Sequence, residues 1–151
     1  MTHEIFKDKA RNSKHITKAR MKQTGEVFTP RELIDEMLDK LPTEVWGAGK
    51  TFLEPAAGDG NFVIAVLERK LTAGCSPTQA IQDVYAIEYM KDNVQVMRRR
   101  VLDLIGHTEW HKKLVRKHIA HANTLDPFDT TDGRRYPKWM DDCPNQSTLD
   151  I

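Results

Sequence analysis

The stretch TFLEPAAGDGNF, Thr51 to Phe62, indicates how this chain folds. An apolar, strand-like run ends at Glu54, glycines follow at Gly58 and Gly60, and apolar residues at helical spacing begin directly afterwards. Glycine adopts positive φ freely and lets other groups approach bare backbone. The stretch therefore predicts a strand, a tight turn and a helix, which together form half of the repeating unit of a parallel sheet.

Helix and strand signals alternate on both sides of this stretch. Thr29 predicts an N-cap, with Pro30 in the first helical position, for an amphipathic helix that ends near Pro42. Ser76 begins a second capping box. The apolar periodicity predicts further helices over 61–73, 93–105 and 110–117, and strands over 51–54, 83–89 and 118–125.

This alternation predicts an α/β fold of Rossmann-like type, with a parallel sheet flanked by helices. After Asp126 the periodic pattern ends, so the sheet is expected to stop after the third or fourth strand. The organisation expected is a basic arm or helix over 1–22, the main domain over 23–128, and an irregular segment over 129–151.

Composition favours a soluble, intracellular protein. The chain has 151 residues, of which 39% are hydrophobic and 30% charged, with a net charge of +1. No apolar run reaches the ~20 residues that span a bilayer, and the N-terminus lacks the core of a signal peptide. Cys75 and Cys143 suggest neither a disulfide framework nor a metal site. A cytoplasmic location without membrane contact is the expectation.

Acidic residues end two neighbouring strands of the expected sheet, at the edge where ligands bind in such folds. Glu54 precedes the glycine turn, and Glu88 ends the strand over 83–89. The chain has no GxGxxG sequence and no GK[ST] phosphate loop, so a pyrophosphate ligand is disfavoured. A carboxylate beside bare backbone suits the cationic methionine end of S-adenosylmethionine, and Glu88 is placed to accept its ribose hydroxyls.

Four segments occur in an order that identifies a family resemblance: TGEVFTP, LEPAAGDGNF, VYAIEYMKDNV and HIAHANTLDPF. From Thr24 to Phe128 the chain resembles S-adenosylmethionine-dependent N6-adenine DNA methyltransferases of restriction–modification type. The resemblance implies that Glu88 holds the ribose and that Tyr89 or Met90 flanks the base. It implies that the methionine end is closed by Thr24, Phe28, Thr29 and Pro30, above a loop of Glu54, Pro55, Ala56, Gly58, Asp59, Gly60 and Phe62.

The third strand ends with HANTL, which extends the expected cofactor site to Asn123 and Thr124. The family usually has an aspartate where this chain has Asn123. An asparagine still accepts a hydrogen bond from the adenine amino group through its carbonyl oxygen, but more weakly than a carboxylate does.

The motif that activates the target amine in this family, Asn/Asp-Pro-Pro-Tyr/Phe, is missing from the sequence. Asp126, Pro127 and Phe128 form the nearest phrase and are the weak candidates for catalysis, although a turn after a strand explains them better. Three interpretations follow. The chain is a methyltransferase domain completed by a partner chain or homodimer, an inactive cofactor-binding or regulatory protein, or a nucleic-acid-binding module with a vestigial pocket.

Basic residues gather in two places that are candidates for contact with DNA. One lies between Lys7 and Lys22, and the other is the run Arg98–Arg100. A solvated helix face or a floppy terminus explains such charge better, and charge alone does not establish a nucleic-acid partner. Histidines at 107, 111, 118 and 121 raise a metal cluster as an alternative, but their spacing matches no established zinc motif, and no metal is predicted.

Overall fold

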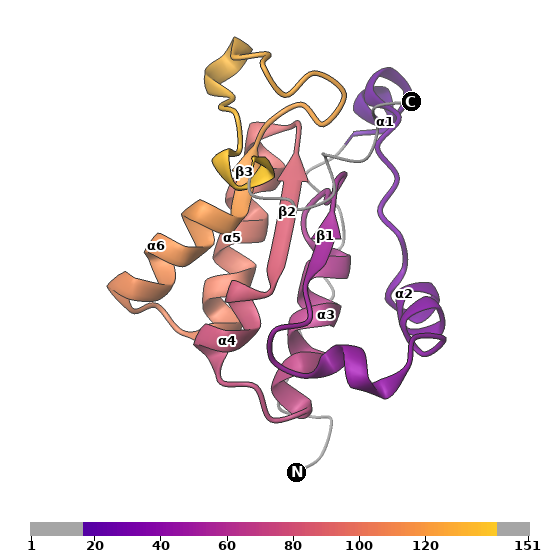
Figure 1. Ribbon diagram of the computed structural model, residues 1–151. Coiled ribbons are helices and arrows are strands. Elements are labelled where there is room, and N and C mark those ends of the chain that lie inside the picture. The colour runs from indigo at the N-terminus through magenta and orange to yellow at the C-terminus, as the bar shows by residue number, and fades with distance from the viewer. Residues whose placement is uncertain (1–16, 142–151) are drawn as a thin grey trace, which may run out of the picture.

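Parallel pairing of three short strands forms the centre of the molecule (Figure 1). The computed structural model describes residues 17–141, in which β1 (Phe52–Glu54), β2 (Val84–Glu88) and β3 (Ile119–His121) lie in the order β1-β2-β3. Helices separate the strands along the chain, as parallel pairing requires. The predicted α/β class, a parallel sheet flanked by helices, is confirmed, and the arrangement is consistent with a Rossmann-like fold.

Capping residues set several helix boundaries where the sequence predicted them. Ser76 Oγ accepts from the backbone N–H of Gln79 at 3.2 Å, and Gln79 Oε1 accepts from Ser76 N–H at 2.9 Å, which confirms the capping box. Gly106 ends the long helix as expected from its position. The helices are α1 (Lys18–Thr24), α2 (Arg31–Leu38), α3 (Asn61–Thr72), α4 (Pro77–Gln82), α5 (Lys91–Ile105) and α6 (Glu109–His118), with 3₁₀ turns η1 (Thr43–Trp46), η2 (Thr131–Gly133) and η3 (Lys138–Met140).

Three predicted boundaries were wrong. The helix expected to end near Pro42 ends at Leu38. Thr29 does not cap α2, because Pro30 occupies the cap position and no side chain bonds to the first turn. The third strand was predicted over 118–125, but His118 is the last residue of α6 and only 119–121 pair with β2.

One face of the sheet is buried against α3 and α5, which lie behind the strands in Figure 1. Phe52 pairs with Val84, and Glu54 pairs with Ala86. Because residues alternate faces along a strand, these four side chains and that of Glu88 share one face. Val84 and Ala86 are buried in the hydrophobic core, so this face leads from the core to the two carboxylates.

The opposite face carries Leu53 and Tyr85 and is covered in part by the segment after β3. Leu53 is 54% exposed. The ring of Tyr85 packs against His118 and Trp139, with centroids 4.6 Å and 4.9 Å away. The described part of the predicted irregular segment, 129–141, therefore contains only short 3₁₀ turns but packs on the sheet.

A buried ion pair connects α3 to the amino end of the sheet. Lys70, with no exposed surface, donates from Nζ to Asp83 Oδ2 at 2.8 Å and to the Gly47 carbonyl at 2.9 Å. Asp83 also accepts from the N–H of Gly49 at 2.9 Å. These bonds fix the loop before β1 to the residue that precedes β2.

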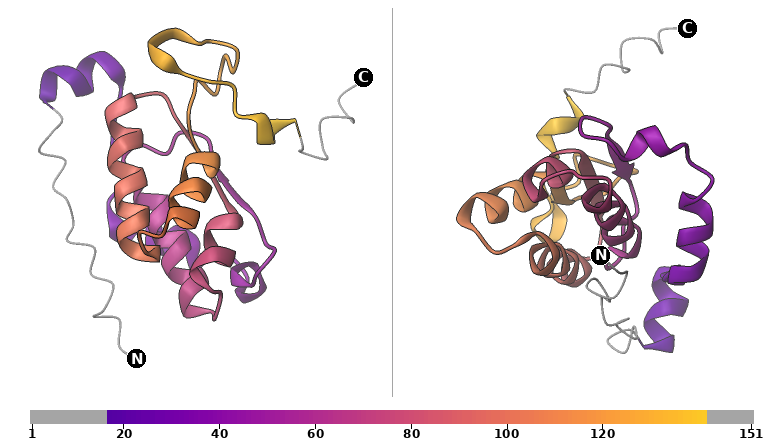
Figure 2. Two further views of the ribbon diagram at one scale, coloured as in Figure 1. Left: turned by 90° about the vertical axis from the view of Figure 1, so that its left-hand side faces the viewer. Right: turned by 90° about the horizontal axis from the view of Figure 1, so that it is seen from below.

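The N-terminal helices α1 and α2 lie on the β1 side of the molecule, away from α6 (Figures 1 and 2). In α2 only Ile34 and Leu38 are buried, whereas Leu33 and Met37 are exposed. None of the helices between residues 17 and 141 is both long and apolar enough to cross a bilayer.

Lys70→Ala should lower the free energy of unfolding by about 3–5 kcal/mol, because it leaves the Asp83 carboxylate buried without its cation. Lys40→Ala is the matched control, since it removes an exposed pair with Glu36 one helical turn away. That control should cost less than about 0.5 kcal/mol. Urea denaturation followed by circular dichroism measures both, and equal losses would contradict a structural role for the buried pair.

Candidate functional site

The turn between β1 and α3 uses both of its glycines for steric reasons. Gly58 and Gly60 have φ of +56° and +99°. A Cβ at Gly60 would lie 2.7 Å from Cγ of Met97 on α5, and one at Gly58 would lie 3.0 Å from Cε1 of Phe28. Gly60 therefore permits helix packing, and Gly58 permits an aromatic ring to lie against the turn.

Glu88 links the end of β2 to this turn. Its Oε2 accepts from the N–H of Gly58 at 2.8 Å, and its Oε1 accepts from the N–H of Met90 at 2.8 Å. The side chain is 7% exposed. Burial raises the pKa of Glu88 above its usual value, although the two backbone donors act in the opposite direction.

Glu54 lies at the end of β1 on the same face and is more accessible. Its Oε1 accepts from the N–H of Ala56 at 3.1 Å, which shapes the start of the turn. After Glu54 the chain still follows β2, because the N–H of Ala57 donates to the carbonyl of Ile87 at 3.0 Å. The structure thus brings Glu54, Gly58 and Glu88 to one edge of the sheet.

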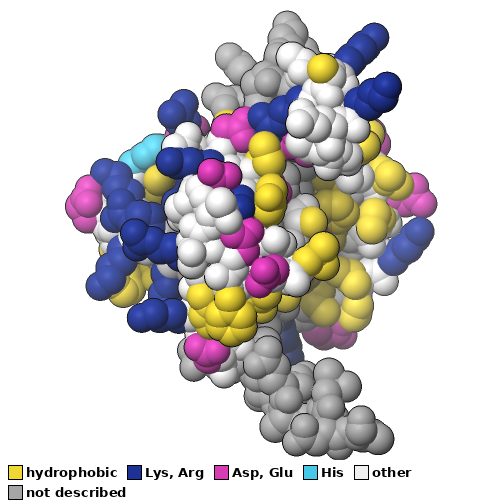
Figure 3. Space-filling view, turned by 90° about the horizontal axis from the view of Figure 1, so that it is seen from above, with side chains coloured by type: hydrophobic (Ala, Val, Ile, Leu, Met, Phe, Trp, Pro, Cys, Tyr) yellow, Lys and Arg dark blue, Asp and Glu magenta, His cyan; other side chains and the backbone are white. Residues whose placement is uncertain are grey.

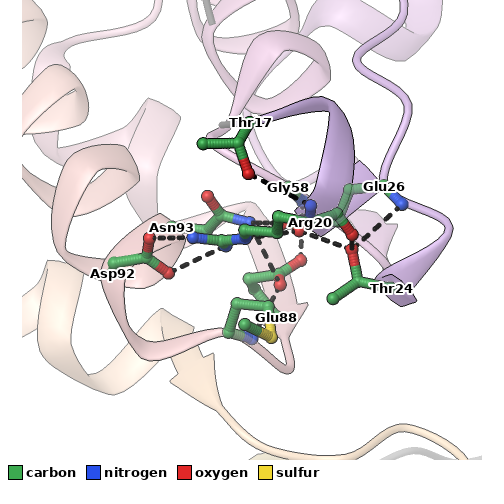
Figure 4. Close-up of polar contacts among 9 residues, drawn as sticks. Thr17, Arg20, Thr24, Glu26, Gly58, Glu88, Asp92 and Asn93 are labelled. Carbon is green, nitrogen blue, oxygen red and sulfur yellow. Dashed lines mark hydrogen bonds and ion pairs between the residues drawn. The ribbon is translucent and has the colours of Figure 1, made fainter. Parts of the chain in front are cut away.

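A third carboxylate, Glu26, belongs to the same site and was missed from the sequence. The side chain of Asn93 connects the two acids, with Nδ2 2.7 Å from Glu26 Oε1 and 3.5 Å from Glu88 Oε1 (Figure 4). Glu26 and Asn93 both lie in segments that carry the family resemblance. No spacing rule joins positions 67 residues apart, so no local signal predicts this contact.

An arginine clamp holds α1 beside these acids (Figure 4). The Arg20 guanidinium donates to Glu26 Oε1 at 2.9 Å and to Asp92 Oδ1 at 3.0 Å, with a further contact to each carboxylate. The hydrogen bond from Arg20 is the main reason that the pKa of Asp92 is lowered. Since α1 has no buried residue, this clamp is its principal described attachment to the sheet domain.

The segment expected to close the methionine end is only partly at the turn. Phe28 lies against Gly58, and the carbonyl of Thr29 accepts from Asn61 Nδ2 at 3.2 Å. Thr24 is exposed and bonds to Glu26 at 2.7 Å, while Pro30 is exposed at the start of α2.

Asp59 and Phe62 point into the protein. Asp59 is 2% exposed, and its Oδ1 lies 3.2 Å from Nη1 of Arg100, which also donates to the Asp59 carbonyl at 2.8 Å. Phe62 packs against the hydrophobic core. Both side chains therefore lie on the interior side of the turn, although they were predicted to contact the cofactor.

The loop after β3 reaches the turn through Thr124. Its Oγ1 donates to the carbonyl of Pro55 at 2.5 Å, and both Pro55 and Ala56 are exposed. Asn123 caps its own turn, with Oδ1 accepting from the N–H of Leu125 at 3.0 Å.

The weak catalytic candidates Asp126, Pro127 and Phe128 form a turn. The carbonyl of Asp126 accepts from the N–H of Asp129 at 3.0 Å. Phe128 is 77% exposed and stacks on Tyr136, with centroids 5.0 Å apart. No described contact joins this turn to Glu88 or Gly58.

Tyr89 and Met90, expected beside the base, border a cleft of about 750 Å³. The Tyr89 ring is half exposed, and the guanidinium of Arg134 lies 4.2 Å from its centroid. The cleft is lined by Arg20, Tyr89, Met90, Lys91, Asp92, Gln95, His121, Asp132, Gly133 and Arg134.

The run Arg98–Arg100 does not form the predicted basic surface patch. Arg100 is 8% exposed and bonds to the glycine turn, and Arg98 donates to the Ile119 carbonyl through Nε and Nη2 at 3.2 Å and 2.6 Å. Arg99 alone of the run is exposed. In the other predicted patch, 1–16 lie outside the described residues, Lys18 and Lys22 are exposed, and Arg20 is engaged in the clamp.

The four histidines lie in separate environments. His107 pairs with Asp103, and His118 is buried against the Val84 carbonyl. His111 contacts Thr78, and His121 contacts the Tyr89 carbonyl. Within 17–141, no group of three or more His, Cys, Asp or Glu side chains is placed to hold a metal ion.

Gly60→Ala should destabilise the protein by more than about 1 kcal/mol, because it adds a contact with Met97 to the strain of positive φ. Gly74→Ala is the matched control: its φ of +97° is nearly the same, but nothing lies within 4 Å of its added Cβ. Thermal unfolding of the two variants isolates the steric part. A Gly74 variant as unstable as the Gly60 variant would show that the contact with Met97 is unimportant.

Arg20→Ala should release α1, since a helix of this length is marginal without tertiary contacts. Backbone amides of residues 18–24 should then exchange with solvent faster. Lys22→Ala, an exposed change on the same helix, should leave these rates unchanged. Unaltered protection in the Arg20 variant would mean that other contacts hold the helix. Hydrogen exchange with mass spectrometry measures both variants.

No family model, curated protein or solved structure matches this chain.

Proposed function

We propose that this chain binds S-adenosylmethionine at the carboxyl ends of β1 and β2, as the cofactor-binding part of an N6-adenine DNA methyltransferase. The observation that carries the proposal is the hydrogen bond between the Gly58 N–H and the Glu88 carboxylate, which joins the second acid to the glycine turn. The segments that carry the family resemblance are separate in the sequence but meet at one edge of the sheet, as a shared binding site requires.

The acceptors that remain at Glu88 suit ribose hydroxyls. Each oxygen of an ionised carboxylate has two lone pairs, and the Gly58 and Met90 N–H groups each use one. The hydrogen bond from Asn93 Nδ2 to Glu88 Oε1 is long, at 3.5 Å, so it leaves the carboxylate free to accept further hydrogen bonds. In this proposal Glu88 holds the ribose, the turn at Gly58 and the ring of Phe28 border the methionine part, and Tyr89 or Met90 lies beside the base.

The charge of the site favours a cationic ligand. Repulsion from Glu26 adds to the burial that raises the pKa of Glu88, whereas the pKa of Glu26, despite its burial, is lowered by hydrogen bonds, that from Arg20 first among them. Glu54 adds a third carboxylate at the rim. A sulfonium or ammonium group nearby would offset this repulsion, whereas a phosphate would increase it.

Bound S-adenosylmethionine supplies an activated methyl group for transfer to a nucleophilic nitrogen. The side chains of this chain bind and orient the cofactor. Phe28 holds the segment before α2 against the turn, and Thr124 does the same for the loop after β3. The groups that would accept hydrogen bonds from a target adenine amine come from elsewhere in this proposal, because the chain lacks the Asn/Asp-Pro-Pro-Tyr/Phe motif. A partner chain that carries this motif completes the enzyme.

Calorimetry with S-adenosylmethionine tests the cofactor site. Glu88→Ala should abolish measurable binding, because the ribose loses its acceptor and the turn loses its anchor. Glu36→Ala, an exposed change on α2, is the matched control and should bind normally. The neutral thioether S-adenosylhomocysteine should bind more weakly than the sulfonium. Absence of binding by the unmodified chain would overturn the proposal.

Cofactor affinity should fall as the solution is acidified, beginning above the ordinary pKa of 4.5, since burial raises the pKa of Glu88. Protonation removes the charge that accepts the ribose hydroxyls, so binding is strongest above the raised pKa and is lost below it. Glu88→Gln should bind weakly with a flat pH profile across that range. A parallel acid limb in both proteins would assign the titration to another group.

Methyl transfer separates the enzymatic interpretation from the inactive one. Incubation with labelled cofactor and adenine-containing DNA should give no transfer by the chain alone, and transfer once a chain carrying the missing motif is added. Cofactor binding without transfer under every such combination would favour the inactive, regulatory interpretation.

A further inference from the structure

A cleft at the carboxyl ends of β2 and β3 combines an exposed aromatic ring with cationic side chains. Tyr89 and Arg134 stack at one side of it, and Lys91 and His121 line it further along. His121 is oriented by its contact with the Tyr89 carbonyl at 3.1 Å. An aromatic face beside cations is the combination by which proteins hold the bases and phosphates of a nucleic-acid strand.

The cations continue from the cleft onto α5 and α6 as a basic strip, which we define as Lys91, Arg98, Arg116 and Lys117. Lys91, Gln95 and Arg98 lie on one side of α5, because residues four and three apart share a helix face. Arg98 is close enough to Arg116 for that charge to lower its pKa, in addition to the effect of burial. Burial and the charges of Arg134, Lys91 and Arg98 likewise lower the pKa of His121.

Acidic neighbours of this region are already engaged with other cations. Asp92 pairs with Arg20, Asp129 with Arg134, and Glu109 with Lys112. Asp132 lies 3.7 Å from Arg134. Among residues 17–141, no carboxylate lies within 4 Å of the cationic groups of the basic strip, so no described acid neutralises its charge, and Arg98 is held in place by its bonds to the Ile119 carbonyl.

Figure 3 shows Lys and Arg side chains gathered on the side of the molecule that carries α6, at the edge of the face where the strands end. Hydrophobic side chains lie between them and the basic groups on the opposite side of this face. Leu125 and Phe128, in the loop after β3, are 96% and 77% exposed. Exposed apolar groups beside uncompensated cations fit a polyanion that also carries flat, apolar bases.

We propose that the cleft and the basic strip bind a nucleic-acid strand, with its phosphates along Lys91, Arg98, Arg116 and Lys117 and a base against Tyr89, which leaves Met90 as the residue beside the adenine of the cofactor. This inference deepens the proposed function by assigning a surface to its DNA partner. Binding at the strip does not require the cofactor, so the two can be tested separately.

Fluorescence anisotropy with a labelled single-stranded DNA tests this surface over a range of salt concentrations. Each phosphate that a variant no longer neutralises should make the slope of log K against log salt shallower by about 0.7. Lys91→Ala and the double variant Arg116→Ala/Lys117→Ala should each show a shallower slope. Lys50→Ala, an exposed change before β1 at the amino end of the strands, is the matched control and should leave the slope unchanged.

Tyr89→Ala should weaken binding roughly 5- to 150-fold without changing the salt slope, as expected when base stacking is removed. Heparin, a polyanion without bases, should bind the unmodified protein and the Tyr89 variant equally. Equal DNA affinity for the Tyr89 variant and the unmodified protein would overturn the base contact, and strip variants that bind like Lys50→Ala would overturn the phosphate contacts.

Calorimetry with S-adenosylmethionine on the strip variants Lys91→Ala and Arg116→Ala/Lys117→Ala distinguishes the two proposals. Loss of DNA binding with unchanged cofactor affinity in the strip variants supports the surface assigned here. An unmodified protein that binds the cofactor but not DNA overturns this inference and leaves the cofactor site standing. A protein that binds DNA through the strip but not the cofactor supports the strip and overturns the proposed function.

Discussion

The hydrogen bond between Gly58 N–H and Glu88 is the interaction on which the candidate site depends. Parallel pairing places the ends of β1 and β2 at the same edge, but pairing alone leaves the loop after β1 unconstrained. The bond fixes that loop, and the buried pair of Asp59 with Arg100 supports it from the side of α5. Positive φ at Gly58 and Gly60 lets the chain turn within this space. Disrupting any of these interactions would misplace a carboxylate.

Local signals in the sequence predicted most elements, and their failures have physical reasons. Ser76 and Gln79 bond reciprocally as expected, because both partners stand within one helical turn. Thr29 failed as a cap because Pro30, with extended backbone, takes the cap position itself. The third strand was overextended because an apolar run does not show where neighbouring backbone ceases to pair.

The candidate site was predictable in its strand ends but not in its cross-connections. Glu54, Gly58 and Glu88 follow from one rule about parallel sheets. Contacts of Glu26 with Asn93 and of Arg20 with Asp92 join residues far apart in the chain, which no local pattern encodes. The run Arg98–Arg100 was wrongly expected to form a basic surface patch. Consecutive residues on a helix point about 100° apart, so three of them cannot all face solvent on a packed helix. Arg100 points inward for this reason.

The outer position of β1 has a practical consequence for handling the protein. Within 17–141, β1 pairs only with β2 and Leu53 is exposed on it, whereas the outer carbonyls of β3 accept from Arg98 and from the Arg135 N–H. Unpaired strand edges act as templates for further strands of the same kind. Concentrated preparations should therefore self-associate edge to edge. A short peptide that pairs with the outer edge of β1, or the substitution Leu53→Lys, should improve solubility by blocking the addition of further strands.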